Sequence, residues 1–220
     1  MTFTDDQNHV ATHNGDYTLV PVVRAEGGPS LTPLIATRRS PRALGGDAIA
    51  PAVLERLLQA ARWAPSSMNA QPWSFIVVRR EDAAAHAQAV SVLMPGNVLW
   101  APKAPLMIVA VARVSFEGKT SHTALYDLGL AVSQLVTQAT AEGLAAHQMG
   151  GFDRAKAREV FALPEGWEPV AMIAIGEVGS PENLPDKLQA GETALRTRKP
   201  LAEIAFEGRF GVAIAGKPGA

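Results

Sequence analysis

The feature that most constrains the fold of this chain is a long run of apolar residues at helical spacing in segment 122–144, "HTALYDLGLAVSQLVTQATAEGL". The apolar positions are Leu125, Leu128, Val132, Leu135, Val136 and Ala139. A helix over this segment would be about 34 Å long, which suits the central helix of a domain that also contains a sheet. We expect its apolar stripe to pack in the core, with a subunit interface as the alternative.

Shorter patterns on both sides of this helix predict an α+β domain. Pro51 suits the first position of a helix that Pro65 ends, and the alanine-rich segment 81–93 predicts another helix. Asp153 is placed to cap a short helix. Because helices and strands do not alternate regularly enough for a doubly wound sheet, we expect helices around a mixed or mostly antiparallel sheet. Its buried strands are predicted at the apolar runs 74–78, 104–112 and 168–179.

The length of 220 residues favours one compact domain. We assign this domain to residues 31–220 and expect residues 1–30, which are polar and contain glycine, to be a loosely ordered leader. From about residue 180 to residue 220 the chain is rich in proline and charge, yet it keeps Leu201, Ile204 and Phe206. A solvated tail gains nothing from such residues, so we expect this arm to wrap over another surface.

Composition excludes several classes of function. The 20 Lys and Arg residues are balanced by 21 Asp and Glu residues, whereas binding to nucleic acid or a membrane surface needs a net basic field. The absence of cysteine excludes disulfides, thiolate nucleophiles and cysteine-ligated metals, and it fits a cytoplasmic protein. The best apolar run, 104–112, is too short to cross a bilayer, and the acidic amino terminus does not resemble a secretory signal.

Standard catalytic and metal motifs are absent from the sequence. The letters "EGKT" at 117–120 mimic the end of a phosphate-binding P-loop, but that motif needs glycine where Arg113 stands. Only His9 and His13 have the i,i+4 spacing of a metal-binding pair, and both lie in the polar leader. Neither H-E-x-x-H nor G-x-S-x-G occurs, so no metal site and no catalytic side chain is assigned.

Three polar clusters remain. Segments 36–44, "ATRRSPRAL", and 194–201, "ALRTRKPL", concentrate arginine, and segment 64–75, "APSSMNAQPWSF", carries hydroxyl and amide groups between an apolar helix and an apolar strand. Each basic cluster alone is typical of a solvated charged turn. Arginine grips phosphate with a planar fork, so the three together indicate one ligand with a phosphate end and a polar heterocyclic end.

Four motifs in order resemble the nitroreductase family of flavin enzymes. They are "RRSPRAL" with "LLQAARWAPSSMNAQPWSFIVV", then "AHQMGGFD", "AIGEVG" and "RTRKPLAEIAFEGRFG", and the resemblance spans residues 32–211. It implies an α+β fold built as an intertwined homodimer, with one FMN in each of two interface sites. The arm of residues 180–220 would then wrap the partner subunit.

The resemblance also implies a set of FMN-binding residues. The phosphate, the ribityl chain and the pyrimidine edge would be held by Arg38, Arg39, Ser40 and Arg42. The partner subunit would supply Pro65, Ser66, Ser67, Asn69 and Gln71. Met149, Gly150 and Gly151 would run beside the ring system, although the two glycines are also typical of a turn before Asp153. Arg196 and Arg198 would close on the phosphate, with Lys199 a weaker candidate.

Two positions depart from the family pattern. Some members carry proline and glutamate before "GFD", where this chain has Gln148 and Gly150. The charge expected near the flavin pyrimidine would come from Arg42, with Lys103 as the alternative. The segment 94–103 is expected to shape a substrate pocket, although Trp100 within it is more typical of core packing.

The implied activity is transfer of hydride from NADH or NADPH, through the flavin, to a nitroaromatic, quinone or similar electron-poor acceptor by a ping-pong scheme. The sequence leaves the acceptor and the choice of nucleotide open. A flavoenzyme of the same fold with other chemistry, such as enoate reduction, dehalogenation or flavin destruction, is one alternative. A non-catalytic protein that binds a phosphate-bearing ligand is another.

Overall fold

A computed structural model describes residues 9–11, 17–19 and 31–215. Most of the predicted leader, 1–30, therefore lies outside the described residues, including His13. The exceptions are two short strands, β1 (His9–Ala11) and β2 (Tyr17–Leu19), which pair antiparallel.

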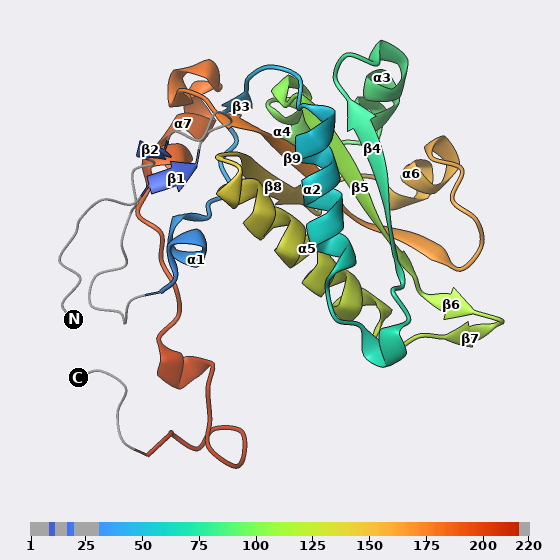
Figure 1. Cartoon of the computed structure of the whole chain (residues 1–220), viewed down its shortest axis with the longest axis vertical. Helices are drawn as coiled ribbons and strands as arrows, with labels where there is room; N and C mark the ends of the chain where they lie inside the picture. Colours follow the sequence, from blue (N-terminus) through green and yellow to red (C-terminus); the bar gives the residue numbers. More distant parts are fainter. Residues whose placement is uncertain (1–8, 12–16, 20–30, 216–220) are drawn as a thin grey trace.

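The core of the structure is a five-stranded sheet in which every pairing is antiparallel. The strand β9 pairs with β5 on one side and with β8 on the other, β4 pairs with β5, and β3 pairs with the end of β9 (Figure 1). The bounds are β3 Leu44–Gly45, β4 Trp73–Arg79, β5 Leu106–Arg113, β8 Ala145–Met149 and β9 Trp167–Val178. The expectation of a mostly antiparallel sheet is confirmed.

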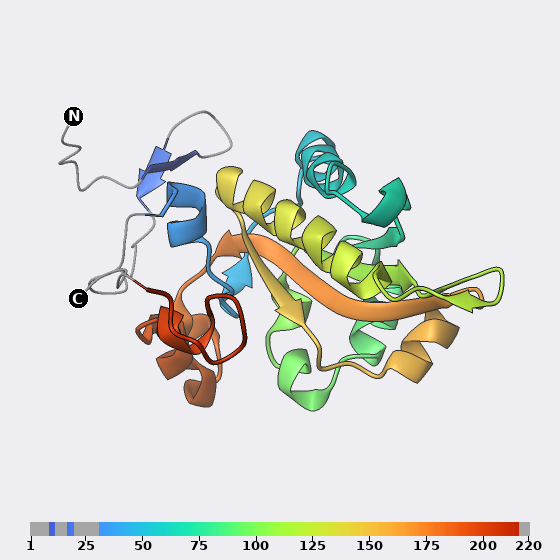
Figure 2. The same cartoon turned by 90° about the horizontal axis from the view of Figure 1, so that it is seen from below.

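Alternation along β5 explains why this sheet has helices on both faces. Leu106 and Ile108 belong to one apolar core, with residues of α2 and α5, whereas Met107 and Val109 belong to a second core on the other face. Figure 2 shows the sheet between these two layers. The flanking helices are α2 (Pro51–Arg62) and α5 (Ala124–Ala141) on one face, with α3 (Ala83–Ser91), α4 (Pro95–Val98) and α6 (Arg154–Val160) on the other.

The central helix α5 is shorter than the predicted segment 122–144. It ends because Gly143 takes a left-handed conformation with φ of 75°, and the next N–H donates to the carbonyl of Ala139 at 2.8 Å. Its 18 residues span about 27 Å. Most of the apolar stripe is buried, but Leu125 is 56% exposed, so the core prediction is wrong at that position.

Local signals at other helix ends agree with the structure. Pro51 begins α2, and the carboxylate of Asp153 accepts a hydrogen bond from the N–H of Lys156 at 3.0 Å. The "EGKT" segment forms the turn between β6 (Ser115–Phe116) and β7 (Lys119–Thr120), where Glu117 and Gly118 both have positive φ. That geometry is a tight hairpin turn and not a phosphate-binding loop.

The sequence patterns missed β8 and the helix α7 (Asp186–Thr193) in the predicted arm.

Beyond α7 the chain runs away from the sheet (Figure 1). Leu201 and Ile204 are 52% and 60% exposed, and the ring of Phe206 lies 4.6 Å from that of Phe210. Wrapping of this arm around a partner stays a prediction.

Within the described ranges, none of the helices combines the length and the apolar character that crossing a membrane requires.

We predict that Leu57→Ala lowers the free energy of unfolding by about 2–5 kcal/mol, because Leu57 is fully buried between α2 and the sheet. Urea denaturation without added ligand measures the loss. The matched control is Glu55→Ala, on the exposed side of the same helix, for which a change within about 0.5 kcal/mol is expected. Equal losses in the two variants would contradict the proposed packing of α2.

Candidate functional site

The first group of predicted site residues lies in the loop between α1 (Pro33–Thr37) and β3. Arg39 donates from its guanidinium to the backbone carbonyl of Glu192. The backbone N–H groups of Arg42 and Ala43 donate to the carboxylate of Glu192 at 3.0 and 3.1 Å. Arg38 donates to the hydroxyl of Ser40 at 3.0 Å. The loop is therefore fixed to the C-terminal segment.

The second arginine group comes from that C-terminal segment and reaches the same loop. Arg196 donates to the backbone carbonyls of Arg38, at 2.8 Å, and of Ala36. Arg198 donates to the carbonyl of Thr197 at 2.7 Å. Two segments about 158 positions apart in the sequence are thus brought side by side, which is what a single phosphate site would require.

Electrostatics within this arginine cluster (Arg38, Arg39, Arg196 and Arg198) are repulsive. Burial lowers the pKa of the Arg38 guanidinium, and the charge of Arg198 lowers it further. The pKa of Arg196 is lowered by burial first and then by the other three arginines. Among the described residues, neither Arg38 nor Arg198 forms an ion pair with a carboxylate. A bound anion would relieve this repulsion.

The third group lies at the end of β8, close to the loop of residues 38–43 between α1 and β3, which we call the arginine loop. Gln148 brings the two together, because its side-chain oxygen lies 3.5 Å from the hydroxyl of Ser40. Met149 is only 3% exposed and its side chain packs in the core. Its expected position beside a flavin ring stays a prediction. The N–H groups of Gly150 and Gly151 donate no hydrogen bond to another described residue, and a Cβ at Gly150 would meet nothing within 4 Å.

His147, in β8, contacts the arginine loop. Its ring lies 4.5 Å from that of Trp100, and its Nδ1 is 2.9 Å from the carbonyl oxygen of Pro41. Burial lowers the pKa of His147, which favours the neutral ring at pH 7. Trp100 is 1% exposed and belongs to the core, in agreement with the packing interpretation.

The loop of residues 64–72 is held in an unusual conformation. Met68, Asn69 and Gln71 all have positive φ, at 52°, 55° and 46°, which costs free energy in residues other than glycine. The hydroxyl of Ser66 accepts from the N–H of Gln71 at 3.0 Å. The N–H of Ser67 donates to the buried carboxylate of Asp127, in the first turn of α5, at 3.3 Å.

This loop is exposed and presents polar groups outward. Pro65 and Ser67 are exposed, and the side chain of Gln71 donates to the carbonyl and the side-chain oxygen of Asn69 at 3.3 and 3.2 Å. Met68 at its tip is 99% exposed. Strained backbone in an exposed, hydrogen-bonded loop is typical of a functional position.

The structure does not bring this loop to the arginine cluster within one chain. The loop contacts the N-terminal end of α5 through Asp127, whereas α1, which precedes the arginine loop, lies beside the C-terminal end of α5 (Figures 1 and 2). The two groups are therefore separated by most of a helix about 27 Å long.

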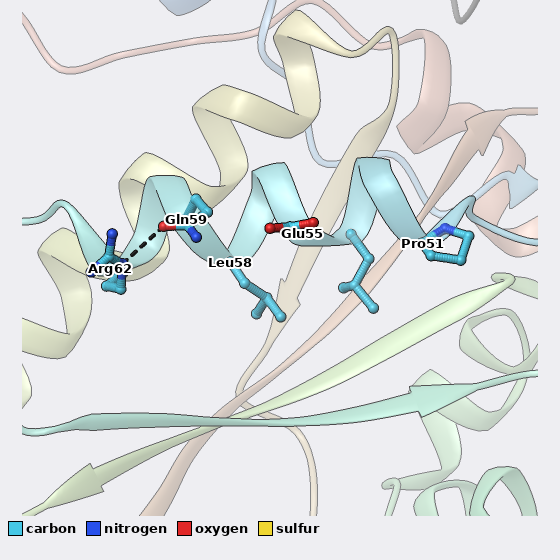
Figure 3. A pocket seen from close by; sticks show the side chains of 6 residues that line it. Pro51, Glu55, Leu58, Gln59 and Arg62 are labelled. Carbon is cyan, nitrogen blue, oxygen red and sulfur yellow. Dashed lines mark hydrogen bonds between the residues drawn. The ribbon is translucent and has the colours of Figure 1, made fainter.

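Two lysines remain among the candidates. Lys199 is exposed, and the ammonium group of Lys103 donates to the carbonyl of Asn183. A surface hollow beside α2 contains none of the predicted residues (Figure 3). It is lined by Pro51, Leu54, Glu55, Leu58, Gln59 and Arg62.

Sequence patterns missed two carboxylates that organise these segments, Glu192 and Asp127. Both are buried, at 8% and 2% exposure. A single acidic residue in a charge-rich tail, or in the first turn of a helix, is typical of a solvated surface. Only the fold reveals that backbone N–H groups of distant loops meet them.

Comparisons with known proteins bear on this arrangement. The family model described as Nitroreductase family matches residues 35–177. A protein of Archaeoglobus fulgidus provisionally named NADH dehydrogenase/NAD(P)H nitroreductase is 30% identical over 164 residues, covering 72% of this chain and 90% of that protein.

Solved structures agree. One described as an oxidoreductase containing FMN is 37% identical with a TM-score of 0.79, covering 86% of this chain and 96% of that one. A nitroreductase family protein of Clostridium difficile 630 is 26% identical with a TM-score of 0.62, covering 80% and 96%. Because the family model matches more than half of the sequence, the chain is an oxidoreductase that belongs to the nitroreductase family.

Proposed function

We propose that this protein is an FMN-dependent oxidoreductase that takes hydride from NADH or NADPH and passes it to nitroaromatic, quinone or similar electron-poor acceptors by a ping-pong scheme. The observation that carries the proposal is the arginine cluster. In it, Arg196 donates to the carbonyl of Arg38 at 2.8 Å, and neither Arg38 nor Arg198 has a carboxylate partner among the described residues. The similarity to a structure described as containing FMN supports it.

The residues present fit the phosphate of FMN. A phosphate dianion commonly draws two or three charge-assisted hydrogen bonds, and the cluster offers that many guanidinium groups. Arg39 and Arg196 spend donors on backbone carbonyls and so fix the cluster. Among the described residues, Arg38 and Arg198 donate only within their own segments, to the hydroxyl of Ser40 and the carbonyl of Thr197. We therefore assign these two side chains to the anion.

Polar groups beside the cluster fit the rest of the cofactor. Ser40 and Gln148 lie next to each other and would hold the ribityl chain and the pyrimidine edge, with Arg42 adding positive charge there. The N–H groups of Gly150 and Gly151 would donate to ring atoms. When bound, FMN supplies the hydride-transfer chemistry, and the chain supplies binding, orientation and charge.

The loop of residues 64–72 would complete the site from a second copy of the chain. Pro65, Ser66, Ser67, Asn69 and Gln71 would then contact the flavin of the partner subunit. Exposed apolar side chains around this loop, Trp63, Met68, Leu125 and Tyr126, favour such a homodimer, because each is more than half exposed in the single chain. Two sites per dimer follow from the symmetry.

The direct test of the proposed activity is anaerobic. The purified yellow protein is titrated with NADH and, separately, with NADPH, and loss of flavin absorbance is followed. Reoxidation by a panel of quinones, nitroaromatics, enoates and halogenated aromatics then identifies the acceptor class. Bleaching without reoxidation by any quinone or nitroaromatic would contradict the proposed acceptors, and a colourless protein that does not take up FMN would contradict the cofactor.

We predict that the double variant Arg38→Ala/Arg198→Ala loses at least about 100-fold in FMN affinity, since each charge-assisted hydrogen bond contributes about 1.5–3 kcal/mol. The protein should stay folded, because neither side chain supports the core. Equilibrium dialysis with FMN measures the loss. The control Lys119→Ala/Lys187→Ala removes the same charge from exposed positions, and equal FMN affinity in the two double variants would contradict the assignment.

Truncation after Lys199 is predicted to convert the dimer to monomers. It removes the exposed apolar residues Leu201, Ile204 and Phe210, which we expect to cover the partner subunit, and it keeps the arginine cluster. Sedimentation equilibrium measures the mass. Truncation after Phe206 would serve as an intermediate variant, with a weaker dimer. A shortened chain that stays fully dimeric would show that the arm does not wrap the partner.

A further inference from the structure

One buried charge near the proposed site has no role in the scheme above. Glu192 lies on α7 and is 8% exposed, and neither a guanidinium nor an ammonium group pairs with its carboxylate among the described ion pairs. Burying a carboxylate without a cation is costly unless hydrogen bonds compensate it. The donors of those hydrogen bonds show which segment the Glu192 side chain contacts.

Among the residues that the structure describes, all the hydrogen bonds to Glu192 from other segments come from the arginine loop. Its carboxylate oxygens accept from the backbone N–H groups of Arg42, at 3.0 Å, and Ala43, at 3.1 Å. Its backbone carbonyl accepts from the guanidinium of Arg39. A single residue therefore contacts three positions of a five-residue stretch, 39–43.

The same residue precedes the second arginine group in the chain. Arg196 and Arg198 follow Glu192 by four and six positions, and Arg196 donates back to the carbonyl of Arg38. Two contacts therefore join the segments that supply the cluster. Arg196 contacts the start of the arginine loop at Arg38, and Glu192 contacts its end at Arg42 and Ala43. Its carboxylate accepts from backbone donors, and it forms no ion pair with a guanidinium group among the described residues.

Removing this carboxylate would leave the two N–H groups without partners. Ala43 is only 3% exposed, so water cannot readily replace the lost acceptor there. An unsatisfied buried donor costs about 1–3 kcal/mol, which the loop can avoid by moving. Movement of residues 39–43 would displace the guanidinium groups and leave the sheet intact.

We infer that Glu192 is a positioning residue for the phosphate end of the cofactor: it holds the backbone of residues 39–43 so that the arginine cluster converges on one anion. The inference rests on the proposed function, because the anion is the phosphate of FMN. A positioning role differs from general structural support in one measurable respect. Its loss should affect ligands that carry the phosphate far more than ligands that lack it.

The test compares FMN with riboflavin, which lacks the phosphate. Flavin-free wild type, Glu192→Gln, Glu192→Ala and the control Glu203→Gln are titrated with each flavin, and quenching of flavin fluorescence gives the dissociation constants. Glu203 is exposed and lies in the same C-terminal segment.

We expect Glu192→Ala to weaken FMN binding at least about tenfold and riboflavin binding less than about twofold, as loss of phosphate contacts predicts. Glu192→Gln keeps one acceptor oxygen and should fall between wild type and alanine, and Glu203→Gln should match wild type. Equal weakening of both flavins, or an unchanged FMN constant in Glu192→Ala, would overturn the inference.

Hydrogen exchange in the flavin-free proteins separates this inference from the proposed function. The amides of Arg42 and Ala43 should exchange faster in Glu192→Ala and Glu192→Gln than in wild type, while amides of β5 and β9 stay protected. If wild type binds neither flavin, the proposed function fails and the exchange of these two amides still decides whether Glu192 holds the loop. Unchanged exchange would overturn the positioning role.

Discussion

The length and burial of α5 constrain where a ligand site can form. The helix packs along the sheet through Leu128, Leu135 and Val136, so its two ends are fixed at opposite ends of the domain. One end carries the loop of residues 64–72, attached through Asp127, and the other lies beside the segment that leads into the arginine loop. A rigid helix of about 27 Å keeps these groups apart in one chain. A site that uses both must therefore draw on two chains.

Repulsion between the clustered arginines is the second constraint on the site, because the fold must hold like charges together. Burial and the charge of Arg198 lower the pKa of Arg38, and burial and the charges of Arg38, Arg39 and Arg198 lower the pKa of Arg196. A bound anion would offset this repulsion. Hydrogen bonds to backbone carbonyls and to the buried carboxylate of Glu192 hold the arginine loop against the C-terminal segment. Under the proposed function, the binding energy of the FMN phosphate is then available to retain the cofactor.

The sequence predicted the fold in outline because strong local signals decided it. Pro51, the β-branched runs of β4 and β5, and the cap at Asp153 each act over a few residues, and the structure follows them. The strand β8 was missed because "AAHQM" has neither alternation nor a continuous apolar run. The exposure of Leu125 was missed because helical spacing cannot distinguish a face that packs within the chain from one that is open in it.

Roles that tertiary contacts decide are harder to read from the sequence. Arginine in two separated segments indicated an anion site, and the fold brings those segments together. The side chain of Met149 packs in the core, which the sequence did not indicate. Glu192 and Asp127 escaped prediction because their partners are backbone groups, which leave no mark on the sequence. Side chains whose chemistry suits a ligand are thus easier to find in a sequence than carboxylates whose partners are backbone groups.

The most direct measurement of the central claim, that each site is shared between two chains, uses heterodimers. One chain carries Arg38→Ala/Arg198→Ala, the other carries Asn69→Ala/Gln71→Ala, and co-expression with two affinity tags isolates the mixed species. A shared site predicts one bound FMN per heterodimer, because one site receives both defects and the other receives none. Neither homodimer should retain FMN. A heterodimer that binds no more FMN than either homodimer would contradict the account, because each site would then belong to a single chain.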